Sequence, residues 1–552
     1  MESLGLTLLV ALVAALALGA LAHRLRLPPM IGYIAAGLLV GPATPGPTAN
    51  REDLIALADI GVALLMFSIG LQFSINEIRS IGPRILLGTP LQVAITMALG
   101  TGTGLALGWE LPEALFIGGA VSVCSTVVLV KLAGESALHT TGYGRAALGV
   151  SIVQDVLTIV LVVALTAIGD EGVTSPIEPL GRTAVALGFV ALVVVAGSRV
   201  LPRLLGLIAG LRSRELFVIG VAVISIGTAF AASALGVSVA LGAFVAGLAL
   251  SDSDLTDSVL GEIVPLRELF STFFFVSIGI LLEPSAVLQQ WASVLVLLAI
   301  ITFGKAVPIA IVARLDGLLP SSAVRAGALI GQSGEFSFVL ASAGLALAAV
   351  RPETFSLAMG AVVISIVTAE PLYAGARWLG ERLDARRSPD PGEEELAAGL
   401  RRHAVILGYG RVGRAVARVL ESRGFAFVAV DSDYAVAREG RASGMRVVFG
   451  EAGSPPVLDR CRIGACHAVI VAIPDALATR QAVAYARSRN PRVEIVARAH
   501  SEAEEVELRR LGVSRVVVAE REVGNELLRH ALRRFGVSDR EAAAMLESRR
   551  RS

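Results

Sequence analysis

The chain has 552 residues, of which 54% are hydrophobic and only 17% are charged, and its formal net charge is +1. Soluble domains average about 25% charged residues, so this composition is typical of a membrane protein, and the near-neutral charge excludes a strongly basic nucleic-acid-binding protein. Residues 1–380 are almost wholly apolar, whereas residues 381–552 have the charge density of a soluble domain. The cysteines, Cys124, Cys461 and Cys466, are too sparse to indicate a disulfide framework, and we expect no structural metal site.

The first 380 residues contain thirteen apolar segments that can span a bilayer. The first segment resembles the hydrophobic region of a signal peptide, but no small-residue cleavage site follows it, so we expect a retained helix. We therefore predict a polytopic α-helical membrane domain over residues 1–380. The predicted spans are 3–22, 29–43, 53–73, 83–108, 112–134, 145–169, 180–201, 215–234, 236–250, 266–283, 289–313, 322–348 and 354–379.

The loops between these segments predict the orientation of the chain. An odd number of spans with a cytoplasmic C-terminal domain places the N-terminus outside. The only Lys or Arg residues in the loops predicted outside are then Arg51, Arg182 and Arg351. The predicted cytoplasmic loops hold most of the basic residues of this region. This asymmetry follows the positive-inside rule, so we expect a multi-pass protein of a bacterial or archaeal plasma (inner) membrane.

Residues 381–402 form a charged linker that contains Pro and Gly. The sequence pattern changes over residues 403–520, and we predict a helical tail at 521–552. The string "HAVILGYGRVGRAVARVLESRGFAFVAVDSD" is typical of strand, glycine turn, helix and strand. Gly408, Gly410 and Gly413 form G-x-G-x-x-G, and Asp431 ends the next strand. Such glycines let a pyrophosphate approach a helix N-terminus, and the acid binds ribose hydroxyls. With strands at 446–452 and 467–474, we predict half of an α/β Rossmann sheet.

Three ionisable residues stand out inside predicted spans: Asp155, Lys305 and Glu335. An aspartate at the bilayer centre costs about 2.5–3.5 kcal/mol on insertion scales, so it indicates a function or a buried partner. Lys131 and Lys305 are the only lysines among 48 Lys and Arg residues, and an ammonium, unlike a guanidinium, can lose its proton when desolvated. The alternative is a structural ion pair between Lys305 and Asp155.

Two spans, at 118–134 and 326–344, have polar centres that indicate interrupted helices. They are the fifth and the twelfth of the predicted spans. This spacing matches an inverted repeat in which two broken helices cross at the midplane and offer freed backbone groups to an ion. The alternative for either segment alone is a Ser- and Gly-rich face for helix packing. The polar residues are Ser122, Ser125 and Thr126 in the first segment and Gln332, Ser333 and Glu335 in the second.

Seven short segments carry a family resemblance: 26–42 (RLPPMIGYIAAGLLVGP), 59–74 (DIGVALLMFSIGLQFS), 122–132 (SVCSTVVLVKL), 151–156 (SIVQDV), 236–250 (GVSVALGAFVAGLAL), 273–283 (FFFVSIGILLE) and 331–340 (GQSGEFSFVL). In this order they resemble the cation:proton antiporter-2 family, and most of all its Kef-type potassium/proton antiporters. The likeness runs from about residue 3 to residue 520.

The resemblance implies a role for each polar residue of the spans. Asp155 matches the aspartate that binds the cation or the proton, and Gln154 matches a position that is Asp in electrogenic sodium/proton relatives. Lys305 matches a lysine near the crossing point. The resemblance also implies transport roles for Ser125 and Thr126 of the first broken helix and for Gln332, Ser333 and Glu335 of the second.

The chemistry of a buried aspartate agrees with this resemblance. Burial favours the neutral, protonated form of a carboxyl group, so a proton and a monovalent cation can compete for Asp155. We expect one-for-one, electroneutral exchange by alternating access, because Gln154 carries no charge. K+ (or Na+) would bind at Asp155, and the preference for K+ follows from the Gln-Asp pair and the Kef resemblance. A Na+/H+ antiporter of the same family is the alternative.

The C-terminal domain resembles the TrkA-N (RCK-type) domain that regulates potassium conductance, binds NAD(H), AMP or ATP and pairs into dimers. The resemblance implies a homodimer in which AMP or NAD(H) gates transport, with no redox cofactor. No catalytic domain follows, so we do not expect an enzyme. The alternative is an empty Rossmann unit that serves dimerisation alone. The expected nucleotide-binding residues are Gly408, Gly410, Arg411, Val412, Gly413, Asp431 and Ser432.

In Kef-type members, glutathione binds this domain and keeps the transporter inactive. Arg411 and Arg498 match arginines of the glutathione pocket in those proteins. The acidic loop that touches the regulatory domain corresponds to residues 252–263, which include Asp257 and Glu262. This loop departs from the usual His-Ala-Leu-Glu pattern, and the chain is short after residue 520. Both departures argue against glutathione gating.

The sequence argues against two other classes of protein. A potassium channel gated by the same domain needs a T-V-G-Y-G filter. The two GYG strings, 142–144 and 408–410, lie in a predicted cytoplasmic loop and in the nucleotide turn, so neither is a pore loop. A membrane-bound dehydrogenase is opposed by the lack of a second cofactor motif.

Overall fold

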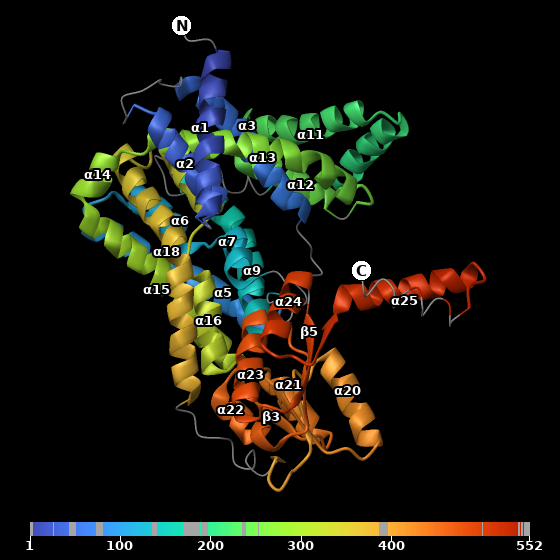
Figure 1. Ribbon diagram of the computed structural model, residues 1–552. Helices are drawn as coiled ribbons and strands as arrows, with labels where there is room; N and C mark the ends of the chain where they lie inside the picture. Colours follow the sequence, from blue (N-terminus) through green and yellow to red (C-terminus); the bar gives the residue numbers. More distant parts are fainter. Residues whose placement is uncertain are drawn as a thin grey trace. The chain divides into compact units, whose positions relative to one another are not determined.

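The computed structural model describes residues 4–25, 27–42, 51–72, 81–134, 138, 141–168, 188, 197–234, 239–251, 253–385, 396–499, 501–538, 541 and 545. The chain forms two compact units (Figure 1). The helical unit comprises Met1–Leu132, Ala146–Val312 and Ala326–Ala374. The sheet unit comprises Ala133–Arg145, Ala313–Arg325 and Gly375–Ser552.

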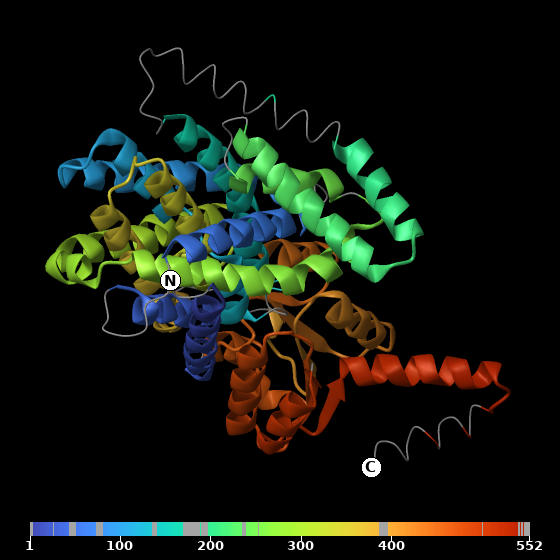
Figure 2. The same ribbon diagram turned by 90° about the horizontal axis from the view of Figure 1, so that it is seen from above.

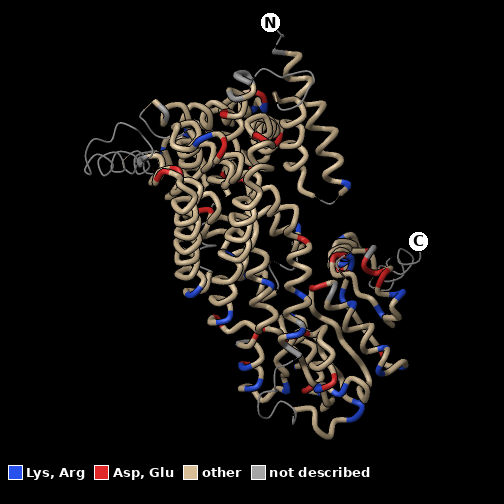
Figure 3. Tube along the Cα trace, turned by 90° about the vertical axis from the view of Figure 1, so that its left-hand side faces the viewer, with Lys and Arg blue, Asp and Glu red and all other residues tan. Residues whose placement is uncertain are grey.

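Apolar α-helices make up the helical unit, and Figure 3 shows few charged residues along them. Within the described residues, 8 helices are long and apolar enough to cross a membrane, and shorter apolar helices are also present. The helices up to residue 385 are α1 (Leu4–Arg24), α2 (Pro29–Val40), α3 (Arg51–Gln72), α5 (Pro83–Ala106), α6 (Leu111–Ser122), α7 (Thr126–Ala133), α9 (Gly142–Ile168), α11 (Arg214–Ala234), α12 (Val239–Leu250), α13 (Thr256–Leu281), α14 (Pro284–Gln289), α15 (Trp291–Leu315), α16 (Pro320–Ile330), α17 (Glu335–Ala346) and α18 (Pro352–Ala385).

Helices occupy the described part of every predicted span. Most of the seventh span, residues 180–201, lies outside the described residues, and residues 197–210 at its end are helical. The number of spans therefore stays a prediction. Two of the predicted spans are divided between two helices: α6 and α7 share the fifth, and α16 and α17 share the twelfth. The interruptions predicted from the polar centres of these two segments are confirmed.

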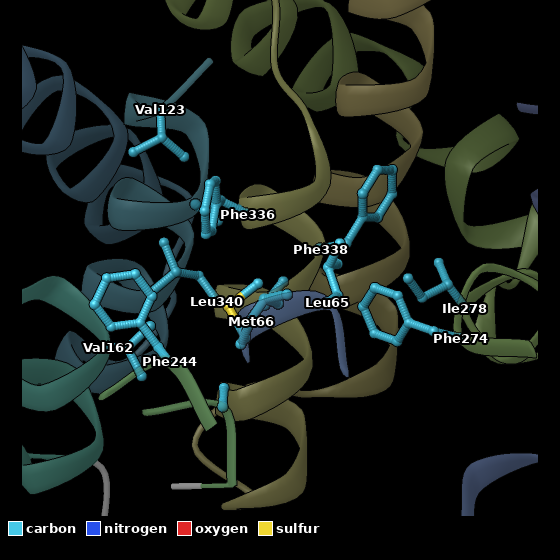
Figure 4. Packing of buried hydrophobic residues seen from close by; sticks show 14 of the residues in the cluster. Leu65, Met66, Val123, Val162, Phe244, Phe274, Ile278, Phe336, Phe338 and Leu340 are labelled. Carbon is cyan, nitrogen blue, oxygen red and sulfur yellow. The ribbon is translucent and has the colours of Figure 1, made fainter. Parts of the chain in front are cut away.

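Bulky apolar side chains from several helices pack into one cluster inside the helical unit (Figure 4). Phe336 and Phe338 of α17 belong to it together with Phe274 of α13. The ring of Phe338 meets that of Phe275 edge to face, with 5.8 Å between ring centroids. Lipid tails are as apolar as these side chains, so close packing rather than exclusion of water holds such helices together. The cluster fixes α17, which begins at Glu335.

A parallel sheet with the strand order β3-β2-β1-β4-β5-β6 forms the centre of the sheet unit. The central strands, such as AVIL and FVAVD, are apolar and buried, as expected when helices cover both faces of a parallel sheet. The elements are β1 (Ala404–Leu407), α20 (Arg411–Ser422), β2 (Phe427–Asp431), α21 (Tyr434–Ala442), β3 (Val447–Phe449), α22 (Pro455–Arg460), β4 (Ala468–Val471), α23 (Ala476–Arg489), β5 (Glu494–Ala499), α24 (Glu502–Arg510), β6 (Arg515–Val518) and α25 (Ala519–Arg534).

The sheet is larger than the predicted half-Rossmann unit. β5 and β6 pair in parallel beyond β4 and complete the strand order of a full Rossmann sheet. The prediction of four strands was wrong because β5 carries Glu494 and Arg498, and β6 begins with Arg515, so neither strand is an uninterrupted apolar run.

The last helix of the described chain, α25, begins at Ala519, two residues before the predicted tail. None of its residues is buried, and it extends away from the sheet in two perpendicular views (Figures 1 and 2). Its link to the rest of the sheet unit includes an ion pair of 2.9 Å between Arg521 and Glu505 of α24. Of the predicted linker 381–402, residues 386–395 lie outside the described residues.

Candidate functional site

Two interrupted helices meet at Ser125 and Gly334. α6 ends at Ser122, Val123 is extended, and α7 begins at Thr126. On the other side, α16 ends at Ile330, and Gly334 is the residue before α17. A Cβ atom at position 334 would overlap the Ser125 side chain. Glycine at this position therefore permits the backbones of the two breaks to approach each other.

Gln332 holds the two breaks together through its side-chain amide. Its Nε2 donates to the carbonyl of Ser125 at 2.9 Å, and its Oε1 accepts from the backbone N–H of the same serine at 3.2 Å. The Ser125 hydroxyl donates to Glu335 Oε2 at 3.1 Å. Backbone groups that are left free inside a membrane must find partners, and here a side chain from the opposite break supplies them.

Lys305 lies on α15 and is completely buried. Its ammonium donates to the carbonyls of Val123 (2.7 Å) and Gln332 (2.6 Å) and to the Ser333 hydroxyl (3.0 Å). The two carbonyls follow the C-terminal ends of α6 and α16, where the helix dipole is negative. All three N–H donors of the ammonium are used.

The alternative of an ion pair between Lys305 and Asp155 was wrong for the residues that the structure describes. The hydrogen bonds of the Lys305 ammonium go to two carbonyls and one hydroxyl, none of them on Asp155. The lysine therefore neutralises the C-terminal ends of two half-helices.

Gln154 is fully buried on α9 and is committed to hydrogen bonds. Its Oε1 accepts from the backbone N–H of Cys124 at 2.7 Å, and its Nε2 donates to Gln92 Oε1 at 2.6 Å. An ionised carboxylate at position 154 could accept from Cys124 but could not donate to Gln92.

Gln92 of α5 belongs to this network and was not predicted. Its Nε2 donates to the carbonyl of Ser122, the last residue of α6, at 3.2 Å, and to Thr96 at 3.0 Å. Thr96 in turn donates to the carbonyl of Gly304, next to Lys305, at 2.7 Å. An uncharged amide inside an apolar span was the available signal, but it is weaker than a charge because its cost in a membrane is smaller.

Asp155 follows Gln154 on α9 and, unlike Gln154, is only half-buried. It lies within interaction range of the Thr126 hydroxyl and the Glu335 carboxylate. Thr126 is also 2.6 Å from the Ser151 hydroxyl. The two carboxylates therefore lie near the first residues of α7 and α17, where the helix dipole is positive. Their oxygens and the nearby hydroxyls are the kind of ligand that binds an alkali cation or a proton.

The G-x-G-x-x-G turn has the geometry that its sequence predicts. Gly408 has a φ of +99°, and a Cβ atom at Gly413 would overlap the Gly408 carbonyl. α20 follows Gly410 without a side-chain cap. Arg411 and Val412 are exposed at its first turn. A helix N-terminus of this kind offers free backbone N–H groups that can bind a phosphate.

Asp431 at the end of β2 faces the turn. One carboxylate oxygen accepts from the backbone N–H of Tyr409 at 2.7 Å and the other from that of Asp433 at 2.9 Å. Burial raises the pKa of Asp431, these two hydrogen bonds oppose the rise, the Asp433 charge adds to it and the Arg145 charge lowers it. Ser432 follows and is half-buried. The predicted nucleotide-binding residues thus come together around one loop.

The four residues proposed for glutathione regulation are divided between the two units. Arg411 and Arg498 belong to the sheet unit, and Asp257 and Glu262 belong to α13 of the helical unit. The Nε of Arg498 on β5 is buried and has no hydrogen-bond partner among the described residues. Both carboxylate oxygens of Glu262 accept from Arg214, at 2.8 and 3.1 Å.

The cysteines of the sheet unit give no sign of metal chemistry. Cys461 and Cys466 are buried free thiols. Burial raises the pKa of Cys466 to about 11, so its thiolate, the form that binds a metal, is scarce at neutral pH. In the part of the chain that the structure describes, no group of three His, Cys, Asp or Glu residues could hold a metal ion.

Both units match known families. Residues 8–374 match the family described as "Sodium/hydrogen exchanger, transmembrane", and residues 404–519 match the TrkA-N domain. Among solved structures, the TrkA-N domain of the inner membrane protein ybaL from Escherichia coli is 30% identical. It aligns with 24% of this chain and 97% of that chain, with a TM-score of 0.23.

Two curated relatives extend over nearly the whole chain. YbaL of Escherichia coli (strain K12), which is named as a cation/proton antiporter, is 34% identical over 535 residues, or 95% of this chain and 96% of that protein. The glutathione-regulated potassium-efflux system protein KefC of Salmonella paratyphi B (strain ATCC BAA-1250 / SPB7) is 28% identical over 534 residues, or 95% of this chain and 84% of that protein. The chain therefore belongs to the transmembrane sodium/hydrogen exchanger family, as a Kef-type cation/proton antiporter with a C-terminal TrkA-N domain.

Proposed function

We propose that the protein exchanges K+ for H+ at Asp155 by alternating access, and that a nucleotide bound to the sheet unit regulates this exchange. The observation that supports the transport site most strongly is the contrast between neighbours on α9. Gln154 is fully buried and held by hydrogen bonds, whereas Asp155 is half-buried beside Thr126 and Glu335. Asp155 is thus the group of the pair that an ion from water can reach.

One-for-one exchange follows from the fixed state of the other groups. Gln154 cannot titrate, and all three N–H groups of the Lys305 ammonium already donate hydrogen bonds within the protein. If Glu335 keeps its hydrogen bond from Ser125 through the cycle, only Asp155 alternates between a proton and a cation. Each turnover then moves one positive charge in each direction, and transport is electroneutral.

The choice of K+ over Na+ rests on Gln154 and on the relatives. One relative is named as a potassium-efflux protein, while the family model is named for sodium. We place the protein in a bacterial or archaeal inner membrane as a homodimer, with the N-terminus outside and the sheet unit in the cytoplasm. The distribution of Lys and Arg among the predicted loops supports this orientation.

Proton flux in proteoliposomes tests the transport site. With a K+ gradient, the wild-type protein should move protons, and Asp155→Asn should reduce the flux to that of empty vesicles because a neutral amide cannot carry a proton in exchange. Glu215→Gln is the matched control, because Glu215 is an exposed acid in the first turn of α11 and should keep wild-type flux. Wild-type flux in Asp155→Asn would remove Asp155 from the mechanism. A larger flux with Na+ than with K+ would favour the sodium alternative.

Membrane potential tests the stoichiometry. Turnover of the wild-type protein should not change when a potential is imposed across the vesicle. Gln154→Glu places a second carboxylate beside Asp155, so its turnover should become potential-dependent if both acids take up protons. A wild-type flux that depends on the potential would contradict one-for-one exchange.

The open N-terminus of α20 and the position of Asp431 support nucleotide binding. AMP and NADH are the ligands to compare, by titration of the purified full chain and by flux with each ligand inside the vesicle. Glutathione belongs in the same titration, because the buried Nε of Arg498 has no hydrogen-bond partner among the described residues. A chain that binds neither AMP nor NADH would leave the sheet unit without its proposed role.

A further inference from the structure

Three side chains from helix ends outside the Rossmann fold bond to loops of the sheet, all within the sheet unit. Tyr143, at the start of α9, donates to Asp475 Oδ2 at 3.2 Å. Arg145, two residues later, pairs with Asp433 Oδ2 at 3.1 Å. Ser322, in the first turn of α16, donates to Glu451 Oε1 at 2.7 Å.

The three acceptors lie at one edge of the sheet. Asp433 follows β2, Glu451 follows β3 and Asp475 follows β4. In a parallel sheet the carboxyl ends of all strands meet at the same edge, and a doubly wound sheet binds its nucleotide there, between the loops after β1 and β4. The helix ends therefore attach at the edge that carries Gly408 and Asp431, not at the opposite edge.

The attachment has an apolar part beside its polar contacts. Leu319, in the loop before α16, is buried in the same cluster as Tyr409 of the glycine turn. The Arg325 guanidinium lies over the Tyr143 ring, 5.6 Å from its centroid. These contacts position the first turn of α9 beside the turn that would hold the nucleotide.

Arg145 contributes a positive charge to this edge of the sheet, which is rich in carboxylates. Asp431, Asp433, Glu451 and Asp475 give the edge four carboxylates, which repel an anionic phosphate. Arg145 bonds to Asp433, whose backbone N–H bonds to Asp431, and its charge also acts on Asp431. The Arg145 side chain is about half exposed (51%) and can therefore face a ligand as well as Asp433.

We propose that Arg145 is part of the nucleotide site, so that a bound nucleotide and the attachment of α9 to the sheet strengthen each other. The ligand is a nucleotide with at least one phosphate, whose negative charge attracts the guanidinium towards the edge. Any coupling between binding and attachment is reciprocal. The same helix carries Asp155 ten residues further on, so nucleotide occupancy acts on the helix of the transport site. This inference rests on the proposed nucleotide regulation.

Nucleotide affinity of the full-length chain in detergent tests the proposal, with AMP and NADH as the probes. Arg145→Gln should bind about two- to fivefold more weakly, the range expected for one half-exposed charge pair. Arg145→Lys keeps the charge and should stay close to wild type. Arg203→Gln, an exposed arginine with no ion pair among the described residues, should bind as wild type. Tyr143→Phe loses one hydrogen bond but keeps its ring under Arg325, so it should show a smaller loss.

Transport measured with and without nucleotide is the second readout. The ratio of the two fluxes should move towards one in Arg145→Gln and stay unchanged in Arg203→Gln. Unchanged affinity and an unchanged flux ratio in Arg145→Gln, with a wild-type chain that binds and responds, overturn this inference and leave nucleotide regulation standing. A wild-type chain that binds neither probe overturns the proposed regulation itself.

Discussion

The crossing of the broken helices and the glycine turn both free backbone groups from regular pairing, but the chain treats those groups differently. At the crossing, Lys305 binds the carbonyls of Val123 and Gln332, and the Gln332 amide binds both backbone groups of Ser125. At the turn, α20 begins after Gly410 with no side-chain cap.

The difference indicates that side chains of the protein pair the freed backbone groups at the crossing, whereas no side chain caps the helix that begins at the turn. At the crossing, the chain supplies almost every polar partner, and Asp155, the proposed transport site, is half-buried. At the turn, the proposed nucleotide would supply the missing partner. Substitutions that remove a partner should therefore damage the crossing more than they damage the turn.

The largest effect is expected for Lys305→Met. Loss of the ammonium leaves two buried carbonyls unpaired, at about 1–3 kcal/mol each, so we expect the free energy of unfolding to fall by about 2–6 kcal/mol. Thermal unfolding in detergent measures this loss. The matched control is Lys131→Met, the other lysine of the chain, which is exposed at the end of α7 and should change stability by less than about 0.5 kcal/mol. Equal stability of the two variants would contradict the view that the Lys305 ammonium stabilises the crossing by pairing its buried carbonyls.

Gly334→Ala should destabilise less, by about 1–3 kcal/mol, because the new Cβ overlaps Ser125 and separates the breaks. Gly227→Ala is the control, since it lies inside α11 with no atom within 4 Å of the position of the added Cβ. There alanine should be neutral or stabilising by up to about 1 kcal/mol. Opposite signs in the two variants, read from thermal unfolding, would support a tight crossing, and a shared sign would not.

The smallest effect is expected at the turn, and it depends on pH. If Asp431 binds ribose hydroxyls as proposed, its ionised form is the stronger acceptor, and its pKa is raised mainly by burial. Nucleotide affinity should therefore fall on acidification, and the fall should begin at a higher pH than for an ordinary aspartate with a pKa of 3.8. Titration of AMP or NADH at several pH values measures this change. Asp431→Asn should bind weakly and without this pH dependence, and a dependence that persists in the variant would assign it to another group.

The sequence predicts the parts of the molecule in which a residue type is costly or geometrically special. Asp155, Lys305 and the polar centres of the two broken helices stand out because polar groups are expensive in an apolar span. The glycine turn stands out because the positive φ of Gly408 and the close approach at Gly413 both call for glycine.

The partners of these residues could not be predicted, because partner choice depends on how distant segments pack. A lysine and an aspartate in one membrane suggest an ion pair, yet Lys305 binds carbonyls that are freed only when α6 and α16 both end at the crossing. Gln92 was missed because an uncharged amide gives a weak signal. Contacts such as that between Arg145 and Asp433 arise from residues that look like ordinary surface charges.

The bonds across the crossing also constrain how the protein is made. Gln332 and Ser125 are 207 residues apart in the chain, and Lys305 and Val123 are 182 apart. At a synthesis rate of about 5–20 residues per second, the first break waits roughly 10–40 s for the residues that satisfy it. During that time the newly inserted α6 and α7 hold unpaired backbone groups inside the membrane. The crossing therefore forms only after Gln332 has been made, and a chain truncated before Lys305 cannot complete it.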